Sequence, residues 1–324
     1  MTRVLTSLAA LLAIAAAAPA TPAAAQTEVT YLLPAAPFLP AFGPWMVAQQ
    51  RGYYAAEGLK VTFQAARGGV DAAKQLGAGN AVIGGGIGDT SILVRPNGVP
   101  VRAVAVLGGG SLMQLVINKD KVAGGIRDLK GKVVTTMAFQ DTTYYALLGM
   151  LATQGMTRND VNAQAAGPVN TWKLFVAGQA DAMAAVPDWT AEAIAAGMKL
   201  EIIPSDTHFK SMAQAIIAAD ETIRTKPELI GKLVSATLKG MKAIMDDADA
   251  AAIDYVKAVP QHAGKEQAMA AVFKLYNRYV YPGQAKLGQI DEARLAALQD
   301  FYVKEGFIPQ ASPVKDLYTN QFVN

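Results

Sequence analysis

Between residues 29 and 219 the chain alternates short apolar runs with segments of helical periodicity. Apolar runs that are rich in β-branched side chains and bounded by glycine or proline predict strands. They cover 29–33, 59–65, 81–83, 101–107, 132–137, 161–166, 182–186 and 200–203, and two further apolar runs cover 112–117 and 213–219. The segments between them predict helices at 43–50, 70–76, 89–94, 142–154, 171–177 and 188–196. Such alternation, with tight glycine turns, is typical of βαβ units and a mostly parallel sheet.

The pattern changes at two points along the chain. Residues 118–131 are polar, and a second alternating block of strands and helices begins after them. After Asp220 the strand-like runs end, and the periodicity predicts a tail of helices. These helices cover 226–245, 247–258, 266–280 and 291–305. The predicted fold is therefore α/β, with two lobes that are each built on a doubly wound, mostly parallel sheet, and a helical C-terminal tail.

Composition narrows the chemistry that this fold could carry. Hydrophobic residues make up 52% of the 324 positions and charged residues 17%, which excludes an intrinsically disordered chain. The 29 basic residues against 26 acidic ones give a net charge of +3, which is no electrostatic footprint for nucleic acid. The chain contains no cysteine and two histidines. Thiol nucleophiles, thiolate metal sites, disulfides and a histidine-rich metal centre are therefore excluded, and we expect no cofactor.

The first 25 residues have the pattern of a signal peptide. Arg3 supplies a positive charge, residues 4–18 form a short apolar run, and 23–25 fit an A-x-A cleavage site. We expect cleavage between Ala25 and Gln26, export, and a periplasmic location if the host is Gram-negative. A membrane anchor is the alternative, but the run is shorter than the ~20 residues that a membrane-spanning helix needs.

Five segments of the chain, taken in order, are similar to motifs of one family. They are WMVAQQRGYYAAEGLKV at 45–61, GG at 68–69 followed by LGAGNAVIG at 76–84, DLKGKVV at 128–134, VAGQADA at 176–182 and PDW at 187–189. In order and spacing the chain resembles the periplasmic substrate-binding proteins of the nitrate/sulfonate/taurine transport type, also called SsuA/THI5-like or NMT1-like. The matches extend from about residue 29 to about residue 203 and do not specify the ligand.

The resemblance implies a type II periplasmic-binding-protein fold, in which two crossing strands join two α/β lobes and the ligand lies in the cleft between them. The first lobe would comprise residues 26–118 and 214–324, and the second residues 119–213. The change of pattern at Asn118 and the isolated apolar run at 213–219 agree with this division.

Candidate ligand-binding residues are expected in the loops that follow the strands, because doubly wound lobes bind ligands at the carboxyl ends of their strands. Glycines there permit close backbone approach, helix starts present N–H donors, and aromatic rings offer stacking faces. The candidates are Phe38, Phe42, Trp45, Gly68, Gly69, Gly86, Gly88, Asp89, Gln140, Thr142, Thr143, Tyr144, Asp188 and Trp189. The run 84–88 predicts a tight strand-to-helix turn that also lines the cleft, and its spacing does not fit a dinucleotide fingerprint.

Several of these candidates have a structural alternative. Asp89 and Asp188 each precede a predicted helix and could simply cap it, as could Asp141 or Thr142. If the two aspartates face the cleft instead, they favour a ligand with donor groups, such as an amine or an aminopyrimidine. Arg67 would favour an anion, but a surface role is equally compatible with its position. The charge of the ligand therefore stays open, while the many aromatic residues near the cleft favour an organic ligand with a planar or apolar part.

The function that this resemblance implies is that of a monomeric solute-binding component of an ABC importer. It would capture a sulfonate, an aromatic carboxylate or a thiamine-precursor pyrimidine, close its lobes, and dock on a membrane permease with its ATPase. No catalytic step and no nucleic acid are involved in this reading. The alternatives are an enzyme on the same fold that works without cysteine, and a ligand-loaded sensor that docks on a membrane receptor.

Overall fold

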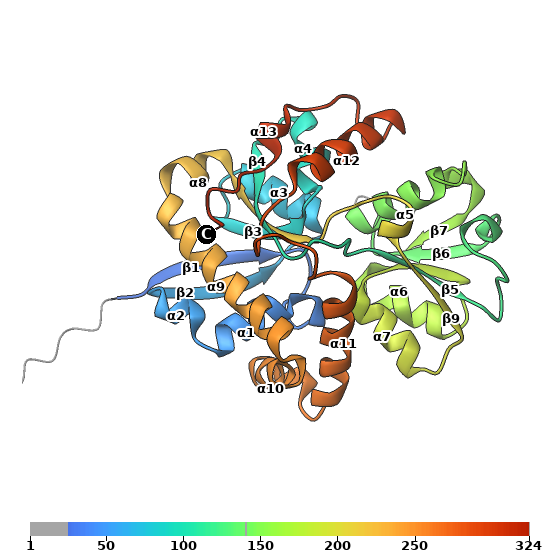
Figure 1. The fold of residues 1–324 in the computed structure, drawn as a ribbon, viewed down its shortest axis with the longest axis horizontal. Coiled ribbons are helices and arrows are strands. Elements are labelled where there is room, and N and C mark those ends of the chain that lie inside the picture. Colours follow the sequence, from blue (N-terminus) through green and yellow to red (C-terminus); the bar gives the residue numbers. More distant parts are fainter. Residues whose placement is uncertain (1–24, 140, 324) are drawn as a thin grey trace, which may run out of the picture.

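The structure is a computed structural model that describes residues 25–139 and 141–323. It contains two five-stranded sheets, each flanked by helices, that form the two lobes seen in Figure 1. The first sheet has the order β2-β1-β3-β10-β4. Its strands are β1 (Thr27–Leu33), β2 (Leu59–Ala65), β3 (Ile83–Ile87), β4 (Val101–Val106) and β10 (Gln214–Ala219). The second sheet has the order β7-β6-β8-β5-β9. Its strands are β5 (Gln114–Asn118), β6 (Val133–Thr136), β7 (Asn162–Ala165), β8 (Ala182–Ala185) and β9 (Leu200–Pro204).

Each sheet is mixed, with a single reversed strand. In the first sheet β1 pairs in parallel with β2 and β3, whereas β10 runs antiparallel to both β3 and β4. In the second sheet β6 pairs in parallel with β7 and β8, whereas β5 runs antiparallel to β8 and β9. The predicted two-lobed α/β fold is confirmed, and four of the five strands in each sheet run in one direction, as expected.

The reversed strands are the ones that follow the two connections between the lobes. Residues 107–113 lead from β4 into β5, and residues 205–213 lead from β9 back into β10. The prediction that residues 114–118 belong to the first lobe is therefore wrong, because β5 pairs between β8 and β9 of the second sheet. The change to polar sequence at Asn118 marks the end of β5, and the boundary between the lobes lies before this strand.

Helices cover both sheets, and their bounds follow the local sequence signals closely. Those of the two α/β blocks are α1 (Gly43–Gln50), α2 (Tyr53–Ala56), α3 (Gly69–Gly77), α4 (Thr90–Val94), α5 (Thr142–Ala152), α6 (Gly167–Val176) and α7 (Pro187–Ala195). The C-terminal tail adds α8 (Asp220–Thr225), α9 (Pro227–Asp246), α10 (Ala248–Ala258), α11 (Glu266–Tyr279), α12 (Glu292–Lys304) and α13 (Val314–Leu317).

The C-terminal helices pack mainly on the first lobe and also reach the second. Helix α9 packs along α1, and α10 packs against α1, α9 and α11. Helix α11 also contacts α7 of the second lobe, and Figure 1 shows these two helices side by side below the connection between the sheets. The two lobes are therefore in contact through this helix pair as well as through the two connecting segments. Among the described residues, the structure has no helix whose length and apolar character would let it cross a membrane.

The glycine run that follows the third predicted strand has a different role from the predicted one. Residues 84–86 lie within β3, which continues to Ile87, so the prediction of a tight turn beginning at Gly84 is wrong. A Cβ on Gly86 would lie 2.7 Å from Thr90 Oγ1, and one on Gly84 would lie 3.1 Å from the Leu32 carbonyl oxygen. The small residues are needed because α3, α4 and β1 lie close against this strand.

Candidate ligand-binding cleft

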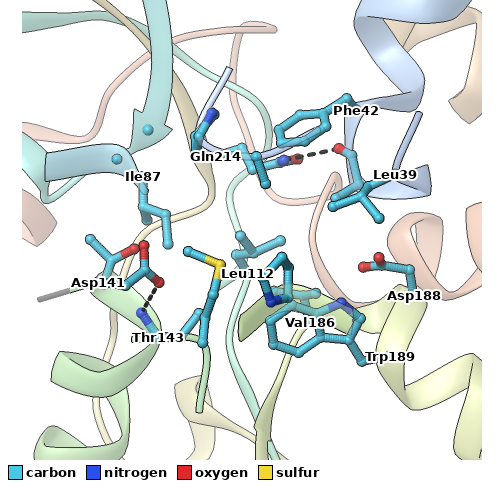
Figure 2. Close-up of a pocket in the computed structure, with 18 residues that line it drawn as sticks. Leu39, Phe42, Ile87, Leu112, Asp141, Thr143, Val186, Asp188, Trp189 and Gln214 are labelled. Atoms are coloured by element: carbon cyan, nitrogen blue, oxygen red, sulfur yellow. Dashed lines mark hydrogen bonds between the residues drawn. The ribbon is translucent and has the colours of Figure 1, made fainter. Parts of the chain in front are cut away.

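A cavity lies between the two lobes, at the carboxyl ends of β1, β3, β6 and β8. The loop after β1 and residues around α3 and β3 contribute Pro34, Ala35, Leu39, Ala41, Phe42, Gly69, Gly86 and Ile87. The second lobe contributes Met137, Asp141, Thr142, Thr143, Pro168, Val186, Asp188 and Trp189. Leu112 comes from the first connecting segment, and Gln214 is the first residue of β10. Figure 2 shows these residues converging from both lobes.

The cavity is small and its lining is mostly apolar. Its volume is about 70 Å³. Pockets that hold drug-sized ligands are roughly 300–1,000 Å³. Leu112, Val186 and the indole ring of Trp189 are nearly buried and lie at its centre (Figure 2). A ligand larger than a few atoms therefore requires the lobes to lie further apart than they do in this structure.

Asp141 brings a buried carboxylate to the meeting point of the lobes. It is the N-cap of α5, where its Oδ1 accepts the Thr143 N–H at 2.9 Å. Burial raises the pKa of Asp141, and hydrogen bonds from backbone N–H groups of Thr143, Gly69 and Thr142 oppose that rise. A Cβ on Gly68 would lie 2.9 Å from Asp141 Oδ2, and Gly68 has a φ of +99°. A side chain at Gly68 would therefore push the two lobes apart.

Asp188 provides the second buried carboxylate, from the first turn of α7. Its Oδ1 accepts the hydroxyl of Tyr276, on α11, at 3.1 Å. Burial raises the pKa of Asp188 to about 7, against an ordinary value of 3.8. In Figure 2 Asp141 and Asp188 lie on opposite sides of Leu112 and Val186.

Gln214 adds a neutral polar group, which no local sequence signal marked. Its Nε2 donates to the Ala41 carbonyl oxygen at 2.9 Å, which fixes the orientation of the amide. Its Oε1 is buried and has no hydrogen-bond partner among the described residues. The side chain is 5% exposed and lines the cavity. Gln214 thus holds a buried acceptor without a partner on the wall of the cavity.

The structure brings together half of the residues that the sequence singles out. The predicted candidates that line the cavity are Phe42, Gly69, Gly86, Thr142, Thr143, Asp188 and Trp189. Gly68 lies beside the cavity through its contact with Asp141. Gln140 lies outside the described residues. Ligand binding by any of these residues remains a prediction.

Two of the aromatic candidates lie elsewhere. Phe38 is 40% exposed and does not line the cavity. Its carbonyl oxygen accepts the Tyr255 hydroxyl at 2.6 Å and lies 2.8 Å from His262 Nε2, so it anchors the loop after β1. Trp45 is buried in the first lobe, where its ring packs edge-on against Tyr31 and Phe42. Both residues shape the loop that lines the cleft and do not face the cavity themselves.

The remaining candidates also face away from the cavity. Gly88 lies against Met212, which a Cβ at Gly88 would meet at 2.8 Å. Tyr144 packs edge-on against Phe139 and lines a separate hollow that α5 shares with the turn after α12. Asp89 is buried beneath β3, where its Oδ2 accepts the Tyr302 hydroxyl at 2.5 Å. Gly88 and Asp89 follow β3, and Tyr144 lies on α5, but each of the three lies against neighbours outside the cavity.

The two capping predictions for aspartates also need correction. Neither Asp89 nor Asp188 makes a capping hydrogen bond, since the N-cap of α7 is Val186 and Asp89 accepts no N–H at the start of α4. Asp141 is the residue that caps its helix. Burial raises the pKa of Asp89 to about 6, and the hydrogen bond from Tyr302 opposes that rise.

The lining residues that the sequence did not single out are mostly apolar. They include Pro34, Leu39, Ile87, Leu112, Met137, Pro168 and Val186. Several of them end a predicted strand or open the loop that follows it. Their position at the end of a strand could therefore have indicated that they line the cavity. Their apolar side chains by themselves indicate only that they are buried in the core.

A family model described as NMT1/THI5 like matches residues 39–251 of the chain. The chain belongs to this family. The predicted resemblance is thereby confirmed, and the match spans both lobes, the two connecting segments and the first C-terminal helices.

Relatives of this family member include proteins described as solute-binding. The riboflavin-binding protein RibY of Chloroflexus aurantiacus is 24% identical over 308 residues, which cover 92% of this chain and 88% of RibY. A solved structure of a Bordetella bronchiseptica RB50 protein superposes with a TM-score of 0.76 at 20% identity, covering 92% of this chain and 96% of that one. The alkanesulfonate-binding protein SsuA of Xanthomonas axonopodis pv. citri superposes with a TM-score of 0.69 at 16% identity, covering 91% and 98%.

These structural likenesses show the periplasmic-binding-protein fold. The same fold also occurs in an enzyme, the desulfurization enzyme DszB, which superposes with a TM-score of 0.56 at 13% identity over 92% of this chain and 97% of DszB. Family and neighbours are mostly binding proteins. The fold is therefore shared by binding proteins and an enzyme, and both the role and the ligand have to be argued from the cleft.

Proposed function

We propose that this protein is the solute-binding component of an ABC importer and that it captures a small organic solute between its lobes. The observation that carries the proposal is the apolar cavity itself. It lies at the carboxyl ends of the strands of both sheets, where doubly wound lobes bind ligands. Two buried carboxylates and a free amide oxygen supply the few polar contacts that give such a pocket specificity.

The working step is closure of the lobes around the solute. Contacts from both lobes to one ligand exist only in the closed state, so the ligand shifts the population toward that state. The connecting segments 107–113 and 205–213 are the hinge, and the lobes on either side move as units. A cavity of about 70 Å³ corresponds to lobes that already lie close together. Entry of the solute requires them to open.

The partners and the location follow from the same proposal. A signal peptide of residues 1–25 is removed, the mature chain works in the periplasm as a monomer, and the loaded form docks on a membrane permease that is driven by an ATPase. Solved neighbours described as SsuA proteins and as ABC-importer binding components support this role. A sensor that docks on a receptor would use the same closed state. Deletion of the permease and ATPase separates the two roles, because a growth defect on the solute is expected only if the protein serves import.

The experiment is native mass spectrometry of the mature protein after gentle purification, followed by thermal unfolding with candidate solutes. A retained small molecule, or a solute that raises the melting temperature, supports a binding protein. A ligand at 100 times its dissociation constant adds about 2.7 kcal/mol of stability. Turnover of a solute that one point substitution abolishes would favour the enzyme alternative. A well-folded protein that neither retains nor responds to any solute contradicts the proposal.

A further inference from the structure

The charged groups that line the cavity all carry the same sign. They are the carboxylates of Asp141 and Asp188, and within the described residues the lining contains no lysine, arginine or histidine. Arg67, the basic residue in the loop before α3, is exposed and lies 3.9 Å from Asp71. It is not among the lining residues. The electrostatics of the cleft are therefore those of a receptor for a hydrogen-bond donor.

We propose that the cleft selects a solute that carries N–H donors, as a cation or a neutral donor, and that it rejects sulfonates and carboxylates. This inference rests on the proposed binding function and names the class of its ligand. Asp141 and Asp188 accept donors on opposite sides of the apolar centre, and Gln214 accepts a third. The middle of the solute then lies over Leu112, Val186 and Trp189, which fits a planar or apolar body (Figure 2).

The N-termini of α5 and α7, which could otherwise bind an anion, already carry the carboxylates of Asp141 and Asp188. Asp141 caps α5 and lies against Gly68 and Gly69 at the start of α3, and Asp188 lies in the first turn of α7. The partial positive charge at a helix N-terminus attracts one anion, and here a side chain of the protein provides it. A sulfonate would meet two buried carboxylates at these helix starts and would be repelled.

Gln214 gives independent evidence for a donor. Its Nε2 donates to the Ala41 carbonyl oxygen, so the atom without a partner among the described residues is Oε1, a buried acceptor on a residue that lines the cavity. A buried polar atom without a partner destabilises the protein. A ligand N–H would remove that destabilisation, whereas an oxyanion would bring a second acceptor against Oε1.

The test uses the mature protein and a pooled small-molecule extract of yeast and bacterial cells. Ion exchange at pH 7.5 separates the extract into cationic, neutral and anionic fractions, and thermal unfolding is measured with each. We expect the cationic fraction, or the neutral one, to raise the melting temperature. A response confined to the anionic fraction overturns the inference and leaves the binding function standing. A response to no fraction overturns the binding function as well.

Variants then identify the groups that hold the active fraction. Asp188→Asn and Gln214→Leu are expected to need roughly 10-fold more of that fraction, or more, for a half-maximal shift. Asp249→Asn is the matched control, since Asp249 is exposed on α10 and pairs with Lys274. Circular dichroism shows whether each variant folds. An unchanged dose response in both cleft variants contradicts the proposed contacts.

A measurement on the unsubstituted protein keeps the proposal testable if a variant fails to fold. Tyr276, Tyr255 and Tyr281 face Asp188 from the C-terminal segment, and Glu192 faces it from its own helix. A cation requires the ionised form of Asp188, so its apparent affinity is expected to fall by up to about tenfold per pH unit below about 7. An anion would bind more tightly as the pH falls, which is the opposite result.

Discussion

The Tyr276 hydroxyl donates a hydrogen bond to Asp188 Oδ1 at 3.1 Å, and this bond joins the two lobes. Asp188 lies on α7 of the second lobe, and Tyr276 lies on α11 of the C-terminal segment that packs on the first. Both side chains are buried, and α7 and α11 contact each other along this line. Asp188 therefore both lines the cavity and takes part in the contact between the lobes.

Replacing Tyr276 with phenylalanine removes this bond and keeps the ring. We expect Tyr276→Phe to lower the free energy of unfolding by about 1–3 kcal/mol, because a buried carboxylate loses a donor. Urea unfolding measures the change. Tyr318→Phe is the control, since the Tyr318 hydroxyl donates to the exposed Glu292 at 2.6 Å and its loss should cost less than about 0.5 kcal/mol. Equal losses in both variants would contradict the role assigned to Tyr276.

The stability of the protein is expected to depend on pH through Asp188. Its pKa is about 7 in the folded protein and near 3.8 when unfolded, so the folded state binds the proton more tightly. Between about pH 4 and pH 7 the folded state holds more protons than the unfolded state, and stability falls as the pH rises. Asp188→Asn removes this contribution and should make the fall of the melting temperature across that window shallower, while Asp89, with a pKa of about 6, and Asp141, whose pKa is also raised, keep part of it. Asp249→Asn should leave the profile unchanged, and the same slope in all three proteins would refute the assignment.

The helices and strands were predictable because their boundaries are encoded locally. The predicted helix at 43–50 and strand at 59–65 have the bounds of α1 and β2. Pro44 sets the first turn of α1, and Gly58 precedes β2 with a positive φ. The family motifs also placed both α/β blocks in their order. Signals within a few residues of an element sufficed for this part.

Pairing between distant segments was not predictable in the same way. The sequence of residues 114–118 contains no signal for the pairing of β5 with β8 and β9. The polar stretch that follows β5 therefore predicted a lobe boundary after this strand, whereas the boundary lies before it. The three glycines at 84–86 predicted a turn, because glycine runs usually form turns. Their role as close-packing positions against β1, α3 and α4 depends on tertiary contacts that the local sequence does not contain.

The candidate site shows the same division. Sequence placed Asp89 and Asp188 at equivalent points after a strand, yet Asp89 binds Tyr302, 213 residues away, and Asp188 lines the cavity. Gln214 gave no local signal, because its role depends on the carbonyl of Ala41 in another segment. The sequence identified the loops that surround the cavity. It did not predict which side chains of these loops point into the cavity, because long-range contacts determine their direction.

Arg294 on α12 holds together the two segments that connect the lobes, 107–113 and 205–213. Its guanidinium donates to the Gly109 carbonyl oxygen and to Asp206 Oδ1, at 2.6 Å each, and to the Ser211 carbonyl oxygen at 2.8 Å. Arg294→Met keeps the stem and removes these bonds. We expect a loss of about 2 kcal/mol in unfolding free energy, below the range for fully buried pairs because Asp206 is about one-third exposed.

The control for the hinge variant is Arg224→Met, on α8. Arg224 pairs with Glu221 on the surface, so its loss should change stability by less than about 0.5 kcal/mol. Small-angle scattering should show a broader range of lobe arrangements for Arg294→Met than for the control. A hinge variant that matches the control in both measurements would show that Arg294 does not hold the segments together.

Two glycines of α9 offer a matched test of how the loop after β1 is positioned. At Gly240 a Cβ would overlap the Pro44 carbonyl oxygen and lie 3.0 Å from Ala48 Cβ, whereas at Gly231 the nearest atom is Phe322 Cδ1 at 3.9 Å. Gly240→Ala forces α1 away from α9 and is expected to cost about 1–3 kcal/mol. Gly231→Ala should stabilise the helix by up to about 1 kcal/mol. Because α1 begins where the cleft-lining loop ends, Gly240→Ala should also weaken ligand binding. Gly231→Ala should leave binding unchanged. Equal binding by the two variants would show that the position of the loop does not depend on the contact between α1 and α9.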